Sequence, residues 1–382
     1  MAVPSSAEVV VIGGGVVGTS IAFHLAEAGA RDVLVLDRGQ LGGGSTCKAA
    51  GGLRAQFSDT LNITLSTRGM AAYQRFADRP GQEIDHRSVG YLFLLSTPDQ
   101  VASFERGVPL QNSLGVPSRM LDVAEAKRLS PLIDTDGLLA AAFSPEDGYA
   151  TPESVVLGYA TGARRHGARL VPHCAVLDIE TAGRDIRAVT TNQGRIATNT
   201  VVCAAGAWSG AVGELVGVSL PVVPVRRQLA FTGPVDLPAE PPFTIDFGSA
   251  FYFRREGRGL MLGLSDPDQE PGFHEDPTDE WLALLSEAIA RRAPSVLDLG
   301  FTGGWAGLYE VTPDHNALIG EAPGVSRFLY ATGFSGHGFM QAPAVGEVVA
   351  DLVLGREPVV DVSPLDAGRF DNAERRTELN YV

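Results

Sequence analysis

Short apolar runs and a helical pattern alternate along the first part of the chain. Residues 8–12 are apolar and β-branched from Val9 onward, which predicts a buried parallel strand. A glycine-rich turn follows at 13–18, and residues 19–28 have a helical pattern that Gly29 ends. Val33–Leu36 is predicted as a second buried strand. Together these segments predict one complete βαβ unit.

The alternation of strands and helices continues along the rest of the chain. Further helices are predicted at 64–76, 151–165, Asp279–Arg292 and 343–354. Further strands are predicted at 89–95, 201–204 and 328–331. Two apolar strands around a polar turn predict a hairpin, with strands at 251–253 and 260–262 and the turn at 254–259. The polar stretch after residue 358 is expected to pack loosely.

Length and charge limit the class of protein. The chain has 382 residues, which suits two domains or one domain with a large insertion. Its net charge of −15 repels phosphate backbones, so nucleic acid is not expected as a partner. No apolar run reaches the roughly 18 residues that a membrane span needs. The apolar run from residue 9 is interrupted by glycines, which predicts a strand and turn rather than a signal peptide.

The cysteines and lysines are few. Cys47, Cys174 and Cys203 are far apart and odd in number, which predicts neither a disulfide framework nor a metal site. We interpret them as reduced thiols of a cytoplasmic protein. Lys48 and Lys127 are the only lysines, so any catalytic lysine must be one of these two residues.

The turn at 13–18 fits the GxGxxG pattern of dinucleotide-binding proteins, and its place between a strand and a helix supports that reading. Gly13 would permit the tight turn, Gly15 would let the backbone reach a pyrophosphate, and Gly18 would allow close packing of helix on strand. The helix N-terminus offers free N–H groups to the phosphates. Asp37, about 20 residues further on, can accept hydrogen bonds from ribose hydroxyls, which disfavours NADP.

The fingerprint alone does not decide between FAD and NAD. Two further glycine-rich strand ends occur late in the chain, at 204–206 and 331–333. A cofactor that crosses a domain built from three distant segments is larger than the fingerprint requires, and this favours FAD.

Two late segments have the most specific pattern, GWAGLYEVTPDH at 304–315 and ATGFSGHGF at 331–339. With these residues, the chain resembles the D-amino-acid oxidase superfamily, in its glycine oxidase and sarcosine oxidase branch, over nearly its whole length. The resemblance implies an α/β fold, α+β overall, with a Rossmann-like FAD-binding domain and a substrate domain on a mixed, largely antiparallel sheet. It places the discontinuous FAD domain at 1–86, 145–220 and 320–370, the substrate domain at 87–144 and 221–319, and a C-terminal tail at 371–382.

The fingerprint and the resemblance together give the residues expected around FAD. They are Gly13, Gly15, Val16, Val17, Gly18, Asp37, Arg38, Ser45, Thr46, Lys48, Ala50, Gly51, Gly52, Leu53, Val176, Ala205, Gly206, Trp208, Gly307, Tyr309, Gly333, Ser335, Gly336, His337, Gly338, Phe339 and Met340.

Several family positions are changed here. Gly307 stands where sarcosine oxidases attach flavin through a cysteine, and Lys48 stands near where dimethylglycine dehydrogenase-like relatives use a histidine. The resemblance therefore implies FAD that is held non-covalently. Met261 replaces the lysine that promotes reaction with oxygen, Met340 replaces a lysine that binds substrate carboxylate, and Tyr309 replaces the carboxylate-binding arginine of glycine oxidase.

The resemblance implies hydride transfer from the α-carbon of a neutral amine to flavin N5, which gives an imine that water hydrolyses. The leading hypothesis is an oxidase of glycine or an N-substituted glycine that reduces O2 to H2O2. The alternatives are a proline- or sarcosine-type dehydrogenase that passes electrons to a quinone or partner subunit, and a non-catalytic flavin-binding subunit. A homo-oligomer is also compatible with the sequence.

Four residues are expected to act on the substrate. Arg54 would pair with its carboxylate, unless it pairs with an acidic residue or a flavin oxygen, in which case Arg226, Arg227 or Arg254 would take this role. Tyr252 and Tyr309 would form the pocket walls and donate a hydrogen bond. His337 would lie beside the flavin or cap a turn. Three changes to apolar residues, at Met261, Met340 and Phe57, predict a substrate bulkier than glycine or sarcosine, unless these side chains pack against the flavin.

Overall fold

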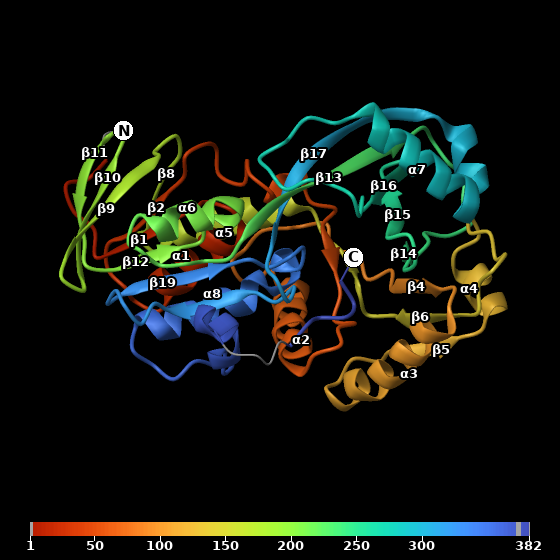
Figure 1. Cartoon of the computed structure of the whole chain (residues 1–382), viewed down its shortest axis with the longest axis horizontal. Coiled ribbons are helices and arrows are strands. Elements are labelled where there is room, and N and C mark those ends of the chain that lie inside the picture. The colour runs from red at the N-terminus through yellow and green to blue at the C-terminus, as the bar shows by residue number, and fades with distance from the viewer. Residues whose placement is uncertain (1–2, 372–375, 382) are drawn as a thin grey trace.

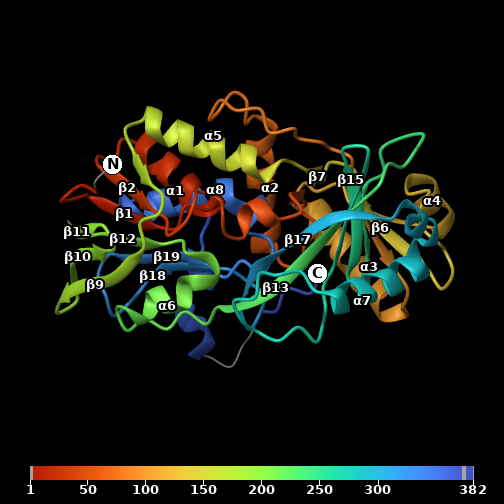
Figure 2. The same cartoon turned by 90° about the horizontal axis from the view of Figure 1, so that it is seen from above.

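The computed structural model describes residues 3–371 and 376–381 of the chain. Figure 1 shows two lobes, each built around its own sheet, and Figure 2 shows the same lobes from above. The mixed α/β architecture expected from the sequence is confirmed. The chain passes from the first lobe into the second and back more than once, because the strands of each sheet come from separated stretches of sequence.

The first lobe contains a six-stranded sheet in the order β18-β19-β12-β1-β2-β8. All neighbours are parallel except β18 and β19. Apolar side chains fill the central strands, which are buried on both faces as parallel strands usually are. The strands are β1 (Val9–Ile12), β2 (Val33–Leu36), β8 (Arg169–Val171), β12 (Val201–Cys203), β18 (Leu318–Glu321) and β19 (Phe328–Thr332).

Four long helices belong to this lobe, and α1 packs against both α5 and α8. They are α1 (Val16–Glu27), α2 (Thr60–Gln74), α5 (Pro152–Arg165) and α8 (Gly338–Val353). Three begin earlier in the chain than predicted. The expected start of α1 at residue 19 is wrong because Gly15, in extended backbone, directly precedes the first helical residue. The expected start of α2 at residue 64 is wrong because the Asp59 side chain caps the helix at Leu61 N and Asn62 N.

The expected start of α8 at Pro343 is also wrong, because this proline lies inside the helix. A proline has no N–H for the carbonyl four residues before it, which here is Phe339. The Tyr73 hydroxyl donates to that carbonyl oxygen at 2.6 Å and so replaces the missing bond. A side chain from α2 therefore allows α8 to begin five residues earlier, at the glycine-rich turn.

The second lobe contains an eight-stranded sheet in the order β17-β13-β16-β15-β14-β4-β6-β5, in which only β14 and β4 are parallel. Its strands are β4 (Tyr91–Leu95), β5 (Arg119–Leu121), β6 (Ala140–Ser144), β13 (Val223–Thr232), β14 (Phe243–Asp246), β15 (Phe251–Glu256), β16 (Gly259–Leu264) and β17 (Phe301–Val311). The predicted hairpin turn at 254–259 is too long, because the strands pair as far as Glu256 and Gly259.

The two faces of this sheet have different neighbours. Leu260 and Leu262 on one face form a core with Trp281, which lies on α7 (Asp279–Arg292). The alternate residues of the same strands face the first lobe. Smaller elements complete the molecule: β3 (Gly52–Leu53), β7 (Gly148–Tyr149), β9 (Val176–Ala182), β10 (Asp185–Thr191), β11 (Gly194–Ala197), α3 (Pro98–Ser113), α4 (Val123–Leu129) and α6 (Ser209–Glu214). Five short 3-10 helices lie at Thr46–Lys48, Gly206–Trp208, Pro294–Leu299, Ser363–Leu365 and Ala367–Asp371.

The expectation of a loosely packed tail is wrong for residues 376–381, although residues 372–375 and 382 of that stretch lie outside the described part. Segment 376–381 lies between the lobes (Figure 1), and the side chains of Glu378 and Asn380 are 1% and 3% exposed. Polar residues can be buried in this way because each finds hydrogen-bond partners there.

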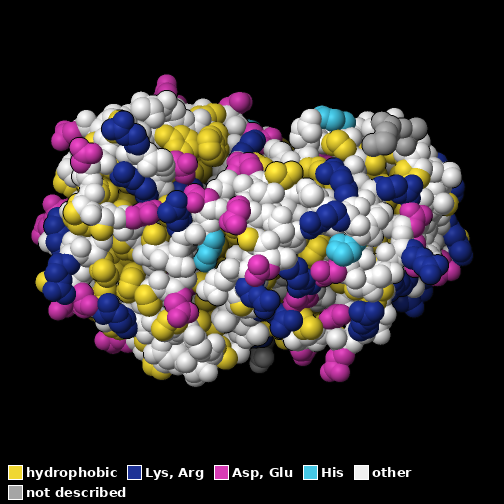
Figure 3. Space-filling model, turned by 180° about the vertical axis from the view of Figure 1, so that it is seen from behind, with side chains coloured by type: hydrophobic (Ala, Val, Ile, Leu, Met, Phe, Trp, Pro, Cys, Tyr) yellow, Lys and Arg dark blue, Asp and Glu magenta, His cyan; other side chains and the backbone are white. Residues whose placement is uncertain are grey.

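The surface carries charges of both signs. Figure 3 shows acidic and basic side chains interspersed over one face of the molecule. Within the described ranges, no helix has the length and apolar character needed to cross a bilayer.

Candidate active site

A cavity of about 910 Å³ extends from the β1–α1 turn to the eight-stranded sheet. This volume is in the upper part of the range of roughly 300–1,000 Å³ that is typical of ligand sites. Gly13 and Gly15 line one part of it, and Gly307 and Tyr309 of β17 line another. The cavity therefore joins the predicted dinucleotide turn to the predicted substrate wall.

The glycine turn has the shape that a pyrophosphate needs. Gly13 has φ +110°, and a Cβ there would collide with the Ala204 carbonyl. A Cβ on Gly18 would collide with the Gly13 carbonyl, so this glycine permits the close approach of α1. Gly15 lines the cavity at the start of α1, where backbone N–H groups and the helix dipole favour an anion. These features fit a dinucleotide phosphate.

Asp37 lies at the end of β2 and lines the same part of the cavity. Its two carboxylate oxygens accept hydrogen bonds from Gly14 N and Gly39 N, both at 2.7 Å. A carboxylate has about four acceptor positions, so two remain for ribose hydroxyls. Next to it, the Arg38 guanidinium lies 4.2 Å from the centre of the Trp208 ring, and both side chains line the cavity.

The two positions that relatives use for covalent attachment meet in this structure. A Cβ on Gly307 would lie 2.8 Å from the Lys48 Cβ. Lys48 Nζ donates to Glu275 Oε1 at 2.6 Å, and Glu275 also lines the cavity. The pair Lys48–Gly307 offers neither the thiol nor the imidazole that the family uses to bond flavin.

We expect acid precipitation of the purified yellow protein to release all its flavin as FAD, because neither attachment position has a suitable nucleophile. The measurement is the absorbance and chromatographic identity of flavin in the supernatant and pellet. Flavin that stays with the washed pellet would contradict non-covalent binding.

The substrate wall is the face of the eight-stranded sheet that looks toward the first lobe. Arg227 of β13 lies opposite Gly307, and Val225 lies opposite Tyr309. Tyr252 of β15 lies opposite Gly263, where a Cβ would collide with the tyrosine ring. Register thus brings one arginine and two tyrosines to the same end of the cavity, and all three line it.

Arg227 is held at both terminal nitrogens of its guanidinium. Nη2 donates to the Tyr381 hydroxyl at 3.1 Å and Nη1 donates to the Arg226 carbonyl at 3.1 Å. The buried Nε has no hydrogen-bond partner among the described residues. Because the Arg227 side chain also lines the cavity, its positive charge can attract an anionic ligand there.

The two wall tyrosines stay protonated at neutral pH. Burial raises the pKa of both Tyr252 and Tyr309 above the ordinary value, because ionisation in this apolar environment is penalised. Each can therefore donate a hydrogen bond to a substrate carboxylate. The Arg227 guanidinium lies 5.1 Å from the centre of the Tyr309 ring, within the range of a cation–π contact.

Unlike the two tyrosines, the Glu310 carboxyl in the cavity has a pKa near neutral pH. Burial raises the pKa of Glu310 to about 7, and its side chain lines the cavity near Gly206. It can gain or lose a proton near neutral pH. Sequence reasoning did not assign a role to Glu310, although it is the only acidic residue in the apolar stretch 304–311.

Arg54 does not line this cavity and has other partners. It is 6% exposed and donates from Nη1 to the Gln56 carbonyl and from Nη2 to the Asn380 carbonyl, both at 2.7 Å. Its guanidinium lies 4.0 Å from the centre of the Phe57 ring. Among the arginines expected as alternatives, Arg254 donates to the Ala50 carbonyl at 2.7 Å, and Arg227 alone belongs to the cavity lining.

His337 is placed as a turn cap. Its Nδ1 lies 3.2 Å from the Ser335 carbonyl, and its Nε2 has no partner among the described residues. Burial lowers the pKa of His337 to about 3, so the ring is neutral. It packs on Phe57 with ring centres 4.9 Å apart and does not line the cavity.

Most of the predicted residues lie together around the cavity. Those that line it are Gly13, Gly15, Val16, Val17, Asp37, Arg38, Ser45, Thr46, Lys48, Ala50, Val176, Ala205, Gly206, Trp208, Tyr252, Gly307, Tyr309, Gly336, Gly338 and Phe339. Those predicted for the site that lie outside its lining are Gly18, Gly51, Gly52, Leu53, Arg54, Gly333, Ser335, His337 and Met340. Phe57, Met261 and Met340 are buried but are not part of the lining, so the apolar changes at these positions lie behind the cavity wall.

Comparison with known proteins gives a consistent picture. Residues 8–352 match the family model described as FAD dependent oxidoreductase, DAO. A solved structure of L-proline dehydrogenase from P. horikoshii is 34% identical, with a TM-score of 0.92 over 98% of this chain and 100% of that chain. Glycine oxidase from Geobacillus kaustophilus is 26% identical, with a TM-score of 0.85 over 96% of this chain and 99% of that chain.

Curated relatives are longer than this chain. Mitochondrial dimethylglycine dehydrogenase of Rattus norvegicus is 30% identical over 95% of this chain and 45% of its own length. The chain thus spans about half the length of such relatives.

Proposed function

Because the chain belongs to the FAD dependent oxidoreductase family, DAO, we propose that it oxidises the Cα–N bond of a secondary amino acid, such as proline or an N-alkyl glycine. Family membership makes it an FAD-dependent oxidoreductase of amino-acid-like substrates. The observation that supports the proposal best is the joint placement of Arg227, Tyr252 and Tyr309 at one end of the cavity. The likeness to L-proline dehydrogenase favours a secondary amine over glycine.

Each wall residue has a role in binding. Arg227 offers a cation to the substrate carboxylate, and the two tyrosine hydroxyls offer neutral donors. The apolar surroundings penalise an ammonium, so the substrate amine is held in the neutral form that can be oxidised. FAD, when bound, accepts the hydride released from the substrate Cα. Glu310, whose pKa is about 7, can take up a proton within the cavity.

The electron acceptor is the second part of the proposal. We favour a dehydrogenase, because Met261 replaces the lysine that the resemblance associates with reaction with oxygen, and this methionine is buried outside the cavity lining. An oxidase that makes H2O2 is the second candidate, supported by the likeness to glycine oxidase.

We expect kcat/KM to exceed that of glycine by at least roughly tenfold for proline and by roughly fourfold for sarcosine, because each added methylene can contribute about 0.8 kcal/mol. The test is anaerobic bleaching of the flavin by each amino acid, followed by steady-state rates across a series of longer N-alkyl glycines. Readmission of O2 then separates the two candidates. Slow recovery of the flavin colour in O2, with fast recovery upon addition of a quinone, would support the dehydrogenase.

Two outcomes would contradict the proposal. Fast recovery in O2 would make the protein an oxidase. A steady decline in kcat/KM from glycine to longer N-alkyl glycines would exclude a secondary amino acid as the substrate.

A further inference from the structure

Segment 376–381 crosses between the lobes and reaches two arginines near the cavity. Asn380 accepts from Arg54, and Tyr381 accepts from Arg227. We propose that Tyr381, at the end of this segment, is a positioning residue of the substrate site, which holds Arg227 in the orientation that binds a carboxylate. The inference rests on the proposed function for the identity of the ligand.

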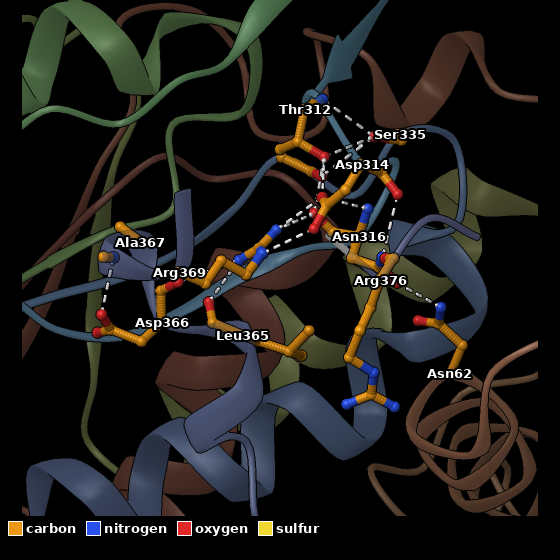
Figure 4. Close-up of polar contacts among 12 residues, drawn as sticks. Asn62, Thr312, Asp314, Asn316, Ser335, Leu365, Asp366, Ala367, Arg369 and Arg376 are labelled. Carbon is orange, nitrogen blue, oxygen red and sulfur yellow. Dashed lines mark hydrogen bonds and ion pairs between the residues drawn. The ribbon is translucent and has the colours of Figure 1, made fainter. Parts of the chain in front are cut away.

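The start of the segment is fixed to the first lobe. Figure 4 shows the Arg376 carbonyl beside Asn316, whose side-chain amide donates to it. Asn316 also donates from its backbone N–H to Asp314, and Arg369 pairs with the same Asp314 carboxylate at 2.8 Å. The contact between Asn316 and the Arg376 carbonyl is therefore supported by the Arg369–Asp314 ion pair, which is largely buried.

The middle of the segment is fixed by Glu378. Its Oε1 accepts from the Ser58 backbone N–H at 2.9 Å and from the Ser58 hydroxyl at 2.8 Å. Its Oε2 accepts from the Asn62 side-chain amide at 3.1 Å. These three charge-assisted hydrogen bonds hold the Glu378 carboxylate, and with it the middle of the segment, against the first lobe. The backbone of the segment is therefore fixed ahead of Tyr381, which contacts Arg227.

The end of the segment reaches the substrate wall. The Asn380 side chain donates to the Gln56 carbonyl at 3.1 Å, and the Tyr381 ring stacks on His315 with centres 3.9 Å apart and planes 6° apart. The stack fixes the direction of the Tyr381 hydroxyl, which accepts from Arg227 Nη2 at 3.1 Å. The bond holds one terminal nitrogen of the Arg227 guanidinium, and the Arg227 side chain lines the cavity.

An arginine side chain has many rotamers, and binding a ligand with it costs the entropy of fixing one. A partner that already holds the guanidinium removes part of that cost before the substrate arrives. The Tyr381 hydroxyl should therefore affect how tightly a carboxylate binds, with little effect on the rate after binding.

The test uses Tyr381→Phe, which keeps the stack on His315 and removes only the hydroxyl. Titration of the FAD-loaded enzyme with acetate, followed by flavin absorbance, should give a Kd raised roughly threefold to tenfold. KM for proline should rise by a similar factor with kcat within about twofold, while pyrrolidine, which has no carboxylate, should be unaffected.

Tyr330→Phe is the matched control, because it also removes a tyrosine hydroxyl, one that donates to Asp366 at 2.6 Å outside the cavity lining. It should leave the Kd for acetate unchanged. Equal acetate affinity in Tyr381→Phe and the unmodified enzyme would overturn the inference, as would an equal shift in both variants. A wild-type enzyme that does not respond to acetate would also overturn it. Acetate binding needs no turnover, so a failure to oxidise any amino acid would count against the proposed function alone.

Discussion

Gly15→Val should leave a folded protein that has lost its flavin. Gly15 lines the cavity in extended backbone that valine tolerates, but a side chain there would fill the space that the pyrophosphate needs. Loss of two charge-assisted hydrogen bonds would cost at least about 3 kcal/mol, which is roughly a hundredfold in affinity for FAD. The measurements are the ratio of flavin to protein after gel filtration and the Kd for FAD added back to the apoprotein.

Gly303→Val is a suitable control, because Gly303 lies on the exposed part of β17 and a Cβ there would meet no atom within 4 Å. This variant should keep its full content of FAD. Circular dichroism should show that both variants are folded. A fully yellow Gly15→Val protein would refute the placement of the phosphates at the start of α1.

Arg227→Leu should raise KM for the amino acid by roughly a hundredfold, because it removes the paired charge-assisted hydrogen bonds to the carboxylate. Arg227→Lys keeps the charge but loses the planar fork, and it should raise KM roughly tenfold. In both variants FAD should remain bound, because Arg227 belongs to the substrate wall and not to the dinucleotide turn. Steady-state kinetics with proline and with pyrrolidine would separate loss of carboxylate binding from general damage.

Arg54→Lys is the informative companion, since the sequence alone favours Arg54 for this role. Its two Nη atoms already donate to the carbonyls of Gln56 and Asn380. We therefore expect this change to lower the melting temperature with a smaller effect on KM than Arg227→Lys. The reverse ranking of the two KM values would assign the carboxylate to Arg54.

The first half of the cofactor site can be predicted from the sequence because its determinants are local. The order of strand, glycine turn and helix lies within 40 residues, and each glycine has one steric role. The first residue of a helix is less predictable where a side chain from a distant part of the sequence stabilises the first turn. The early start of α8 depends on the Tyr73 hydroxyl, which is 266 residues away in sequence.

The arginine at the substrate wall could not be chosen from the sequence for a similar reason. The sequence pattern predicts no strand beside Arg54 or Arg227, and only the pairing of β13 with β17 shows that Arg227 lies on the cavity side of the sheet. The polar composition of segment 376–381 predicts exposure, since nothing local reveals the buried acceptors and donors in the first lobe that bind Glu378. The place of Arg227 on the cavity wall and the burial of segment 376–381 both depend on contacts between distant parts of the chain.

The alternation of side chains in β13, β15, β16 and β17 has a consequence for how such an enzyme can diversify. One set of residues packs into the core under α7, and the interleaved set includes Arg227 and Tyr252, which line the cavity. Mutations in the second set can alter substrate preference without disturbing the first, so selection can act on the two sets almost independently. Gly263 belongs to the second set, and its lack of a side chain leaves the space that the Tyr252 ring occupies. In a directed-evolution library, Gly263 and Arg227 would be the natural pair to randomise together for acceptance of new amines.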